Sequence, residues 1–126
     1  MVTKITKEIK KLIENNPVAF ASKDKKGNIH CIAVAFVKVV SENQVLITDN
    51  YMKKTKENIL ENSQVALAVW NNKNWQKECI GYELKGIAKY YSKGKWYKRV
   101  KEIPENKKEP CKGAVLVTIQ EIKKLA

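Results

Sequence analysis

Hydrophobic residues near the start of the chain recur with the period of an α-helix. They fall at positions i, i+4, i+7 and i+8 and are Ile5, Ile9, Leu12 and Ile13. This spacing places them on one side of a helix, with lysines and glutamates on the other side. The pattern predicts an amphipathic helix over Thr3 to Glu14, ended by Asn15-Asn16-Pro17. We expect its apolar side to cover one end of a β-barrel.

Short apolar runs rich in β-branched residues dominate the rest of the chain and predict β-strands. The expected strands are Pro17 to Ser22, Ile29 to Val40, Gln44 to Thr48, Gln64 to Trp70, Ile80 to Tyr91 and Lys112 to Ile122. The run from residue 29 to 40 has few polar interruptions, so it should be one long strand, buried on both faces or facing a ligand on one. Strands in meander order with few helices predict a mainly β fold, an antiparallel barrel.

Polar residues and glycines divide these strands. The expected turns and loops are residues 25–28, 41–43, 71–77 and 104–110. Gly81 and Gly86 lie inside a predicted strand, where glycine usually marks a bulge or a sharp bend. Such a bend is needed to close a small barrel.

Two short helices are predicted between the strands. One covers residues 55–62, with Ile59 and Leu60 on one side. The other covers residues 95–103, and its common side carries Trp96, Val100 and Ile103.

The composition predicts one domain and a preference for anionic partners. A chain of 126 residues suits a single hydrophobic core, so we expect one domain over residues 1–126. The 25 Lys+Arg against 13 Asp+Glu give a formal net charge of +12, which favours nucleic acid, a membrane surface or a phosphorylated small molecule. Arg99 is the only arginine, and lysine lacks the planar fork that reads bases, so sequence-specific DNA recognition is disfavoured. Acidic residues are interspersed with the lysines, which is also typical of a solvated surface.

The cysteines indicate neither a disulfide framework nor a metal site. Cys31, Cys79 and Cys111 are odd in number and far apart, without a CxxC pair. No apolar run approaches the roughly 20 residues that a membrane span needs, and the N-terminal residues are too charged for a signal peptide. We expect a cytoplasmic protein with reduced thiols and no membrane partner.

The connection between the strand at residues 44–48 and the following helix carries the most specific pattern. Thr48-Asp49-Asn50-Tyr51-Met52 leads into Lys53, Lys54 and Thr55, where the helix should begin. The first N–H groups of a helix lack intrahelical acceptors and the helix dipole is positive there, so an anion binds well. Two lysines and a hydroxyl at this point predict a phosphate site. The alternative is that the lysines are solvated surface charge and Thr55 is a simple N-cap.

No catalytic set can be assembled from the sequence. His30 is the only histidine and has no serine or carboxylate partner at a recognisable spacing, so a structural or surface role is expected. Cys31 follows it directly, but neighbours in a strand face opposite sides, which argues against a Cys-His dyad. No carboxylate pair for acid–base chemistry can be picked out.

The order of these motifs resembles the pyridoxamine 5'-phosphate oxidase-like split-barrel flavoproteins. The corner from Thr48 to Thr55 is similar to the family's phosphate-binding corner, in which a Lys-Thr or Arg-Lys pair grips the FMN phosphate. Other stretches resemble the first hairpin, the long middle strand and the last strand of the family; they are Val18 to Ser22 with Gly27 to His30, Gly81 to Ala88, and Gly113 to Ile119. The resemblance spans nearly the whole chain and implies an antiparallel six-stranded split barrel.

The resemblance implies an FMN-binding flavoprotein with FMN at a homodimer interface. Its expected function is that of an oxidoreductase or electron carrier acting on a small-molecule redox substrate or electron donor. A flavin carries out hydride or electron transfer on its own ring, so the missing acid–base pair is no obstacle. The implied cofactor-binding residues are Ala33, Val34, Ala35, Thr48, Asp49, Asn50, Lys53, Lys54 and Thr55. The oxidase activity itself is disfavoured, because those enzymes are longer and carry C-terminal arginines.

The resemblance leaves two interpretations of Cys111. In the family, the segment before the last strand approaches the flavin of the neighbouring subunit, so this thiol could lie near the cofactor. The alternative, which we favour, is a buried structural thiol.

Two further interpretations of the whole chain stay open. A small basic barrel could bind single-stranded nucleic acid without catalysis, with Tyr51, Trp70, Trp75 or Tyr90 as stacking platforms. The same fold could also hold another redox cofactor, such as a deazaflavin or haem.

Overall fold

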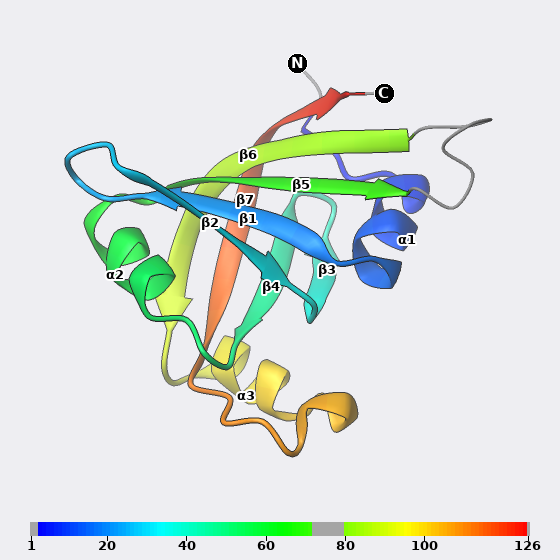
Figure 1. Ribbon diagram of the computed structural model, residues 1–126. Helices are drawn as coiled ribbons and strands as arrows, with labels where there is room; N and C mark the ends of the chain where they lie inside the picture. Colours follow the sequence, from blue (N-terminus) through cyan, green and yellow to red (C-terminus); the bar gives the residue numbers. More distant parts are fainter. Residues whose placement is uncertain (1–2, 72–79, 126) are drawn as a thin grey trace.

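A computed structural model describes residues 3–71 and 80–125 of the protein. Within these residues, seven antiparallel strands form one curled sheet in the order β2-β1-β5-β6-β7-β4-β3 (Figure 1). The strands are β1 (Val18–Lys23), β2 (Ile29–Val34), β3 (Val37–Ser41), β4 (Gln44–Asp49), β5 (Gln64–Asn71), β6 (Ile80–Tyr91) and β7 (Gly113–Lys124). The helices are α1 (Lys7–Asn15), α2 (Lys54–Glu61) and α3 (Lys95–Lys101), followed by a 3-10 turn over Pro104–Asn106.

The predicted single strand from Ile29 to Val40 is wrong at its centre, where Ala35 and Phe36 leave the sheet. β2 pairs with β1 and β3 pairs with β4, so these two consecutive strands form opposite edges of the sheet. An apolar run favours extended backbone but does not reveal where the hydrogen-bonding partner changes. The expected mainly β, antiparallel split barrel is therefore confirmed, with seven strands in place of six, and its open seam lies between β2 and β3.

The bend predicted from glycine occurs at Gly86. The register between β6 and β7 shifts between Lys85 and Gly86, and a Cβ at Gly86 would collide with the carbonyl oxygen of Thr118. Gly81 stays in regular register with Trp70, so the expectation of a bulge there is wrong. The other predicted strands are confirmed to within two residues at each end, and β6 has the predicted bounds.

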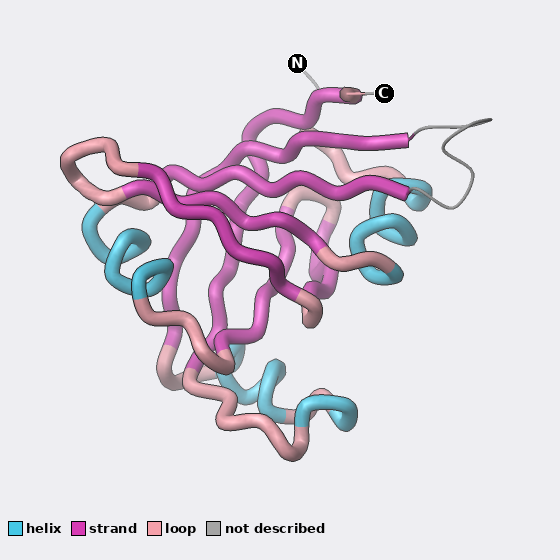
Figure 2. The backbone as a smooth tube through the Cα atoms, in the orientation of Figure 1, coloured by secondary structure: helices cyan, strands magenta, loops and turns pink. Residues whose placement is uncertain are grey.

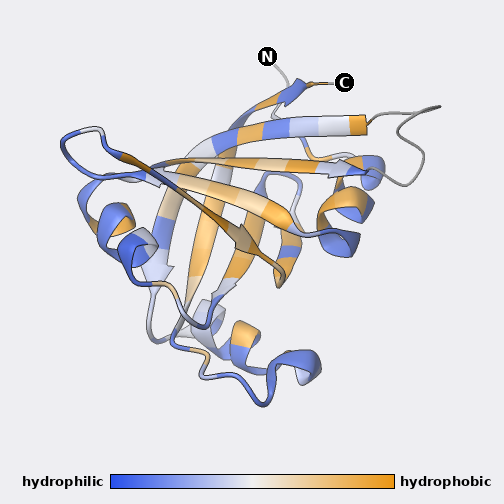
Figure 3. Cartoon of the chain, viewed as in Figure 1, coloured by the Kyte–Doolittle hydropathy of each residue, from blue (hydrophilic) through white to orange (hydrophobic). Residues whose placement is uncertain are grey.

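Helix α1 is amphipathic as predicted but begins later. Thr6 caps it by accepting a hydrogen bond from the Ile9 amide at 3.2 Å. Before the cap the chain is tied to the sheet, because the Ile5 amide donates to the Glu42 carbonyl at 2.6 Å. The apolar side of α1 is buried in the main core, which fills the inside of the curled sheet (Figure 3).

One prediction for the two other helices, the burial of Leu60 beside Ile59, is wrong. In α2, Ile59 is buried but Leu60 is 68% exposed, since consecutive residues point about 100° apart around a helix. In α3, Val100 is buried with Cys111 and Ala114 in a smaller second cluster, against which Trp96 and Ile103 pack.

Some predictions fall outside the described residues: Trp75, Cys79 and the part of the polar loop over residues 72–77. In the described ranges, no helix has both the length and the apolar character that crossing a membrane requires.

Candidate functional site

A cavity of about 590 Å³ lies between β2 and the connection from β4 to α2. Its apolar wall comes from β2 and the two residues that follow it, and its polar wall comes from residues 48–55. The lining residues are His30, Ile32, Ala33, Val34, Ala35, Phe36, Thr48, Asn50, Tyr51, Met52, Lys53, Lys54, Thr55 and Glu109. Two stretches that are more than ten residues apart in the sequence therefore meet at one site.

Eight of the nine residues predicted to contact a cofactor line this cavity; the exception is Asp49. Asp49 is fully buried behind the wall. One carboxylate oxygen accepts from the Met52 amide at 2.7 Å, and the other accepts from the Tyr90 hydroxyl. Burial, together with the Asp49 carboxylate, raises the pKa of Tyr90 above its ordinary value. Asp49 thus shapes the connection and does not face the cavity.

The start of α2 is open toward this cavity. The N-cap residue is Lys53, and no side chain provides a capping hydrogen bond. Lys53 and Lys54 are exposed at the cavity wall, whereas Lys56 lies over the Tyr90 ring at 4.7 Å from its centroid. Thr55 is buried and is the second residue of the helix, so the interpretation of Thr55 as a simple N-cap is wrong. Uncapped N–H groups beside two ammonium groups are the donors and charge that an anion requires.

Thr48 adds a polar atom that the protein leaves unused. The residue is only 6% exposed, and its Oγ1 is buried without a hydrogen-bond partner among the described residues. A buried hydroxyl without a partner costs free energy. Thr48 lines the cavity, although its Oγ1 has almost no accessible surface.

The segment before β7 holds the connection from behind. The Lys112 amide donates to the Asp49 carbonyl at 2.7 Å, and the Lys112 ammonium donates to the Met52 carbonyl at 2.6 Å. Tyr51 donates its hydroxyl proton to Glu109, which also reaches the cavity rim. Figure 2 shows the loop before α2 and the loop before β7 meeting at the lower end of the sheet.

The family model of pyridoxamine 5'-phosphate oxidase matches residues 5–126. The chain belongs to this family. An uncharacterized protein of Methanocaldococcus jannaschii is 39% identical over 125 residues, which cover 96% of this chain and 80% of the relative. The resemblance drawn from the motifs is therefore confirmed.

Solved structures with a similar fold include proteins whose names refer to FMN, haem or F420. HupZ of Group A Streptococcus has a TM-score of 0.85 at 22% identity and covers 96% of this chain and 94% of its own. An FMN-binding protein of Syntrophomonas wolfei has a TM-score of 0.77 at 15% identity, and the match covers 93% of this chain and 83% of that protein. HutZ, the haem storage protein of Vibrio cholerae, has a TM-score of 0.70 at 12% identity, and the match covers 95% of this chain and 94% of HutZ. An F420 reductase has a TM-score of 0.65 at 17% identity, and the match covers 90% of this chain and 94% of the reductase. At these identities the likeness shows the fold.

Histidine and cysteine occupy distinct environments in this family member. His30 lines the cavity, while Cys31 is exposed on the other face of β2, so strand alternation separates them as predicted. Cys111 is buried in the second cluster, and burial raises the pKa of its thiol. Cys111 is not among the lining residues, which favours the structural interpretation. In the described part of the chain, no group of three or more His, Cys, Asp or Glu could hold a metal ion.

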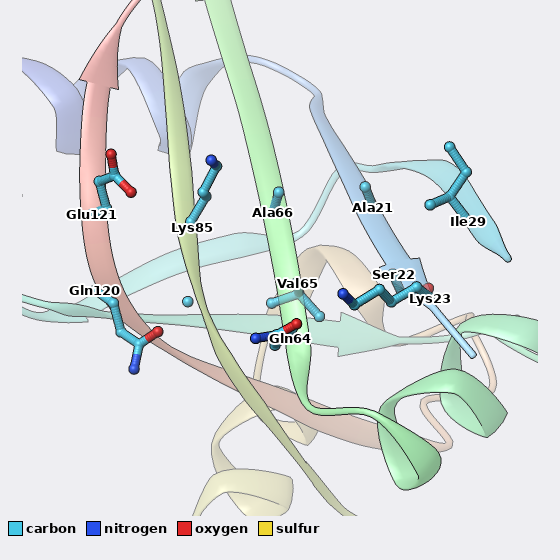
Figure 4. Close-up of a pocket in the computed structure, with 11 residues that line it drawn as sticks. Ala21, Ser22, Lys23, Ile29, Gln64, Val65, Ala66, Lys85, Gln120 and Glu121 are labelled. Carbon is cyan, nitrogen blue, oxygen red and sulfur yellow. The ribbon is translucent and has the colours of Figure 1, made fainter. Parts of the chain in front are cut away.

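A second cavity of about 650 Å³ lies on the face of the sheet away from the main core. Ala21, Ala66 and Lys85 project there from neighbouring strands, with Glu121 beside Lys85 (Figure 4). Ile29, at the start of β2, is 86% exposed at its margin. This face is a flat floor of small side chains with charged and polar residues around it.

Sequence reasoning missed several residues of the site. His30, Met52 and Glu109 line the cavity, and Asn106 supports it from behind through Asn50. Only the alternation in β2 could have placed His30 with Ile32 and Val34; the contribution from residues 106–112 depends on a distant loop and left no local pattern.

The proposed stacking platforms are dispersed. Tyr51 and Trp70 are exposed on the corner and at the end of β5, and Tyr90 is engaged with Asp49. These positions do not support a continuous row of rings for a single strand of nucleic acid.

Proposed function

We propose that this protein binds FMN in the cavity between β2 and the start of α2, and acts as an oxidoreductase or electron carrier. The observation that carries the proposal is the uncapped start of α2, with two lysines, at the wall of this cavity. A phosphate needs donors and positive charge, and both are present there.

The residues present suit the two ends of FMN. Lys53, Lys54 and the first N–H groups of α2 would hold the phosphate, while the apolar wall formed by residues 32–36 would contact the ring system. The volume of about 590 Å³ lies within the range of about 300 to 1,000 Å³ that is common for small-molecule sites. Ala33 and Ala35 have short side chains, so the backbone of this wall can approach a flat ring closely.

The chemistry of such a site resides in the cofactor. A bound flavin would supply hydride or electron transfer. The chain's own residues bind and orient: lysines fix the anionic end, the wall around Ala35 excludes water, and Thr48 offers a hydroxyl. Glu109 is the one carboxylate among the described lining residues, so these residues do not provide a carboxylate pair for acid–base catalysis.

We further propose that two copies of the chain associate through the outer face of the sheet. Ala19 and Ala21 on β1 stand beside Ala68 and Ala66 on β5, and the exposed Ile29 borders them. Strand β2 carries Ile29 to this face and Ala33 to the cofactor cavity. A second copy on this face would therefore also approach the cavity. Lys85 and Glu121 lie on the same face, so in a twofold arrangement the lysine of one copy can face the glutamate of the other.

Haem is the second candidate, because His30 projects into the same cavity and imidazole is a common axial ligand of haem iron. FMN accounts better for the helix start, since haem carries carboxylates and no phosphate. The absorbance spectrum of the purified protein separates the two: oxidised flavin and haem have different visible bands, and His30→Ala should abolish the haem spectrum only.

The phosphate assignment is tested with Lys54→Ala, titrated with FMN and with riboflavin, which lacks the phosphate. Loss of a charge-assisted contact of about 1.5 to 3 kcal/mol should weaken FMN roughly ten- to hundredfold and leave riboflavin nearly unchanged. Lys26→Ala, in the exposed turn between β1 and β2, is the control with the same change of charge. An equal loss for both ligands, or none for FMN, would contradict the assignment.

A further inference from the structure

The corner of the cavity is supported by a residue that does not line it. Asn106 ends the 3-10 turn over Pro104–Asn106 and is only 3% exposed. Its side-chain amide faces that of Asn50: Asn50 Nδ2 donates to Asn106 Oδ1 at 2.7 Å, and Asn106 Nδ2 donates to Asn50 Oδ1 at 3.0 Å. Two opposed amides that exchange both bonds fix each other's position and plane.

The same segment fixes the rest of the connection. The Cys111 amide also donates to Asn50 Oδ1, at 3.2 Å. On either side of Asn50, Lys112 donates to the carbonyls of Asp49 and Met52. Residues 49–52 are thus tied to residues 106–112 immediately before the chain enters Lys53 and α2.

We propose that Asn106 is a positioning residue for the anion site: through Asn50 it fixes the connection that presents Lys53, Lys54 and the start of α2 to the ligand. This role rests on the proposed function for the identity of the ligand. The phosphate end depends on it more than the ring end, since β2 and its wall are held by separate pairing with β1.

The variant Asn106→Ala removes both amide bonds at once. We expect it to weaken FMN about tenfold, the equivalent of one lost hydrogen bond of the stronger kind, with less than about a twofold change for riboflavin. Hydrogen exchange of the ligand-free protein should become faster in residues 50–55 and stay unchanged in β5. If Asn106→Ala does not fold, Asn106→Asp serves instead, because it keeps the volume and sets a carboxylate oxygen against Asn50 Oδ1.

Two further variants separate positioning from a general loss of stability. Val100→Ala removes packing from the second cluster beside the same segment without touching the amide pair, so it should lower stability but keep the ratio of FMN to riboflavin affinity. In the double variant Asn50→Ala/Asn106→Ala, FMN affinity should equal that of Asn50→Ala, because the two residues act through one contact.

The positioning role is overturned if Asn106→Ala leaves both the ratio of FMN to riboflavin affinity and the hydrogen exchange of residues 50–55 at native values. It is also overturned if Val100→Ala changes both quantities as much as Asn106→Ala does. Additive losses in the double variant would also overturn it. If the native chain does not bind FMN, the proposed function fails, and the exchange measurement, which needs no ligand, still decides whether Asn106 positions the corner.

Discussion

The starts of helices α1 and α2 differ in a way that separates stability from binding. At α1, Thr6 supplies a side-chain cap and the following apolar residues are buried. At α2, the N-cap is Lys53, no side chain caps the helix, and the nearby Thr48 hydroxyl lacks a partner. At α1 the side-chain cap satisfies one of the first N–H groups, whereas at α2 these groups remain available to a ligand. The difference agrees with the proposed function, in which α1 stabilises the fold and α2 binds the ligand.

The largest expected effect comes from giving α2 a cap of its own. In Lys53→Asp, the new carboxylate would accept from the helix N–H groups and interact favourably with the dipole, raising the free energy of unfolding by about 0.5 to 1 kcal/mol. The same carboxylate would occupy and repel the position of the phosphate, so FMN affinity should fall roughly a hundredfold. Urea denaturation and FMN titration measure the two effects.

The matched control for that variant is Lys26→Asp, which makes the same change of charge in the turn between β1 and β2. It should leave FMN affinity within about twofold, because Lys26 does not line the cavity. If Lys26→Asp weakened FMN as strongly as Lys53→Asp, the effect would belong to the overall charge and not to the helix start.

A smaller effect of the same kind is expected at Thr48. Thr48→Val keeps the shape and removes the unpartnered hydroxyl, so the free protein should gain about 1 kcal/mol of stability, since that hydroxyl is buried without compensation. FMN should bind about tenfold more weakly if the hydroxyl contacts it. Thr118→Val is the control, because the Thr118 hydroxyl accepts from Gln44 Nε2 at 3.4 Å and its removal should bring no gain. Native FMN affinity in Thr48→Val would show that the Thr48 hydroxyl does not contact the ligand.

The contrast between the helix starts also marks how far the sequence could predict this site. Residues 53–55 were predictable because lysines and a threonine at a strand-to-helix junction form a local pattern. The apolar wall at residues 33–35 entered through the family resemblance, not through the pattern. Asp49 was assigned to the cofactor because it lies within the motif, yet its carboxylate is satisfied by Met52 and Tyr90. Sequence proximity does not tell which way a side chain at a strand's end is turned.

What could not be predicted depends on long-range pairing. β6 was predicted with its observed bounds because its polar and apolar positions alternate within a single element. The break at Ala35 and Phe36 depends on the change from pairing with β1 to pairing with β4, which an apolar run does not encode. The amide pair of Asn50 and Asn106 joins residues 56 positions apart, and neither amide forms a local motif.

At α1 we expect a change in stability without a change in FMN affinity. Thr6→Ala removes the cap and should lower the free energy of unfolding by about 1 kcal/mol. FMN affinity should stay within about twofold, because α1 covers the core and none of its residues lines the cavity. Weaker FMN binding in Thr6→Ala, at temperatures where the variant is fully folded, would break the division between the two helices.

The smallest effect concerns the ties behind the two helix starts. Behind α1 the Lys4–Glu42 ion pair is largely exposed, and such pairs contribute little. Behind α2 the corresponding contact is the hydrogen bond from Tyr90 to the buried Asp49. Burial and this carboxylate raise the pKa of Tyr90.

An unfolded tyrosine ionises near pH 10, so as the pH rises above that value the unfolded chain loses a proton that the folded chain keeps. The stability contributed by neutral Tyr90 is therefore complete below about pH 10 and decreases as the pH rises further. The difference in urea midpoint between the native protein and Tyr90→Phe should be constant from pH 7 to 9 and shrink above pH 10. A difference for Tyr90→Phe that persisted unchanged above pH 10 would mean that the tie to Asp49 does not hold the proton on Tyr90.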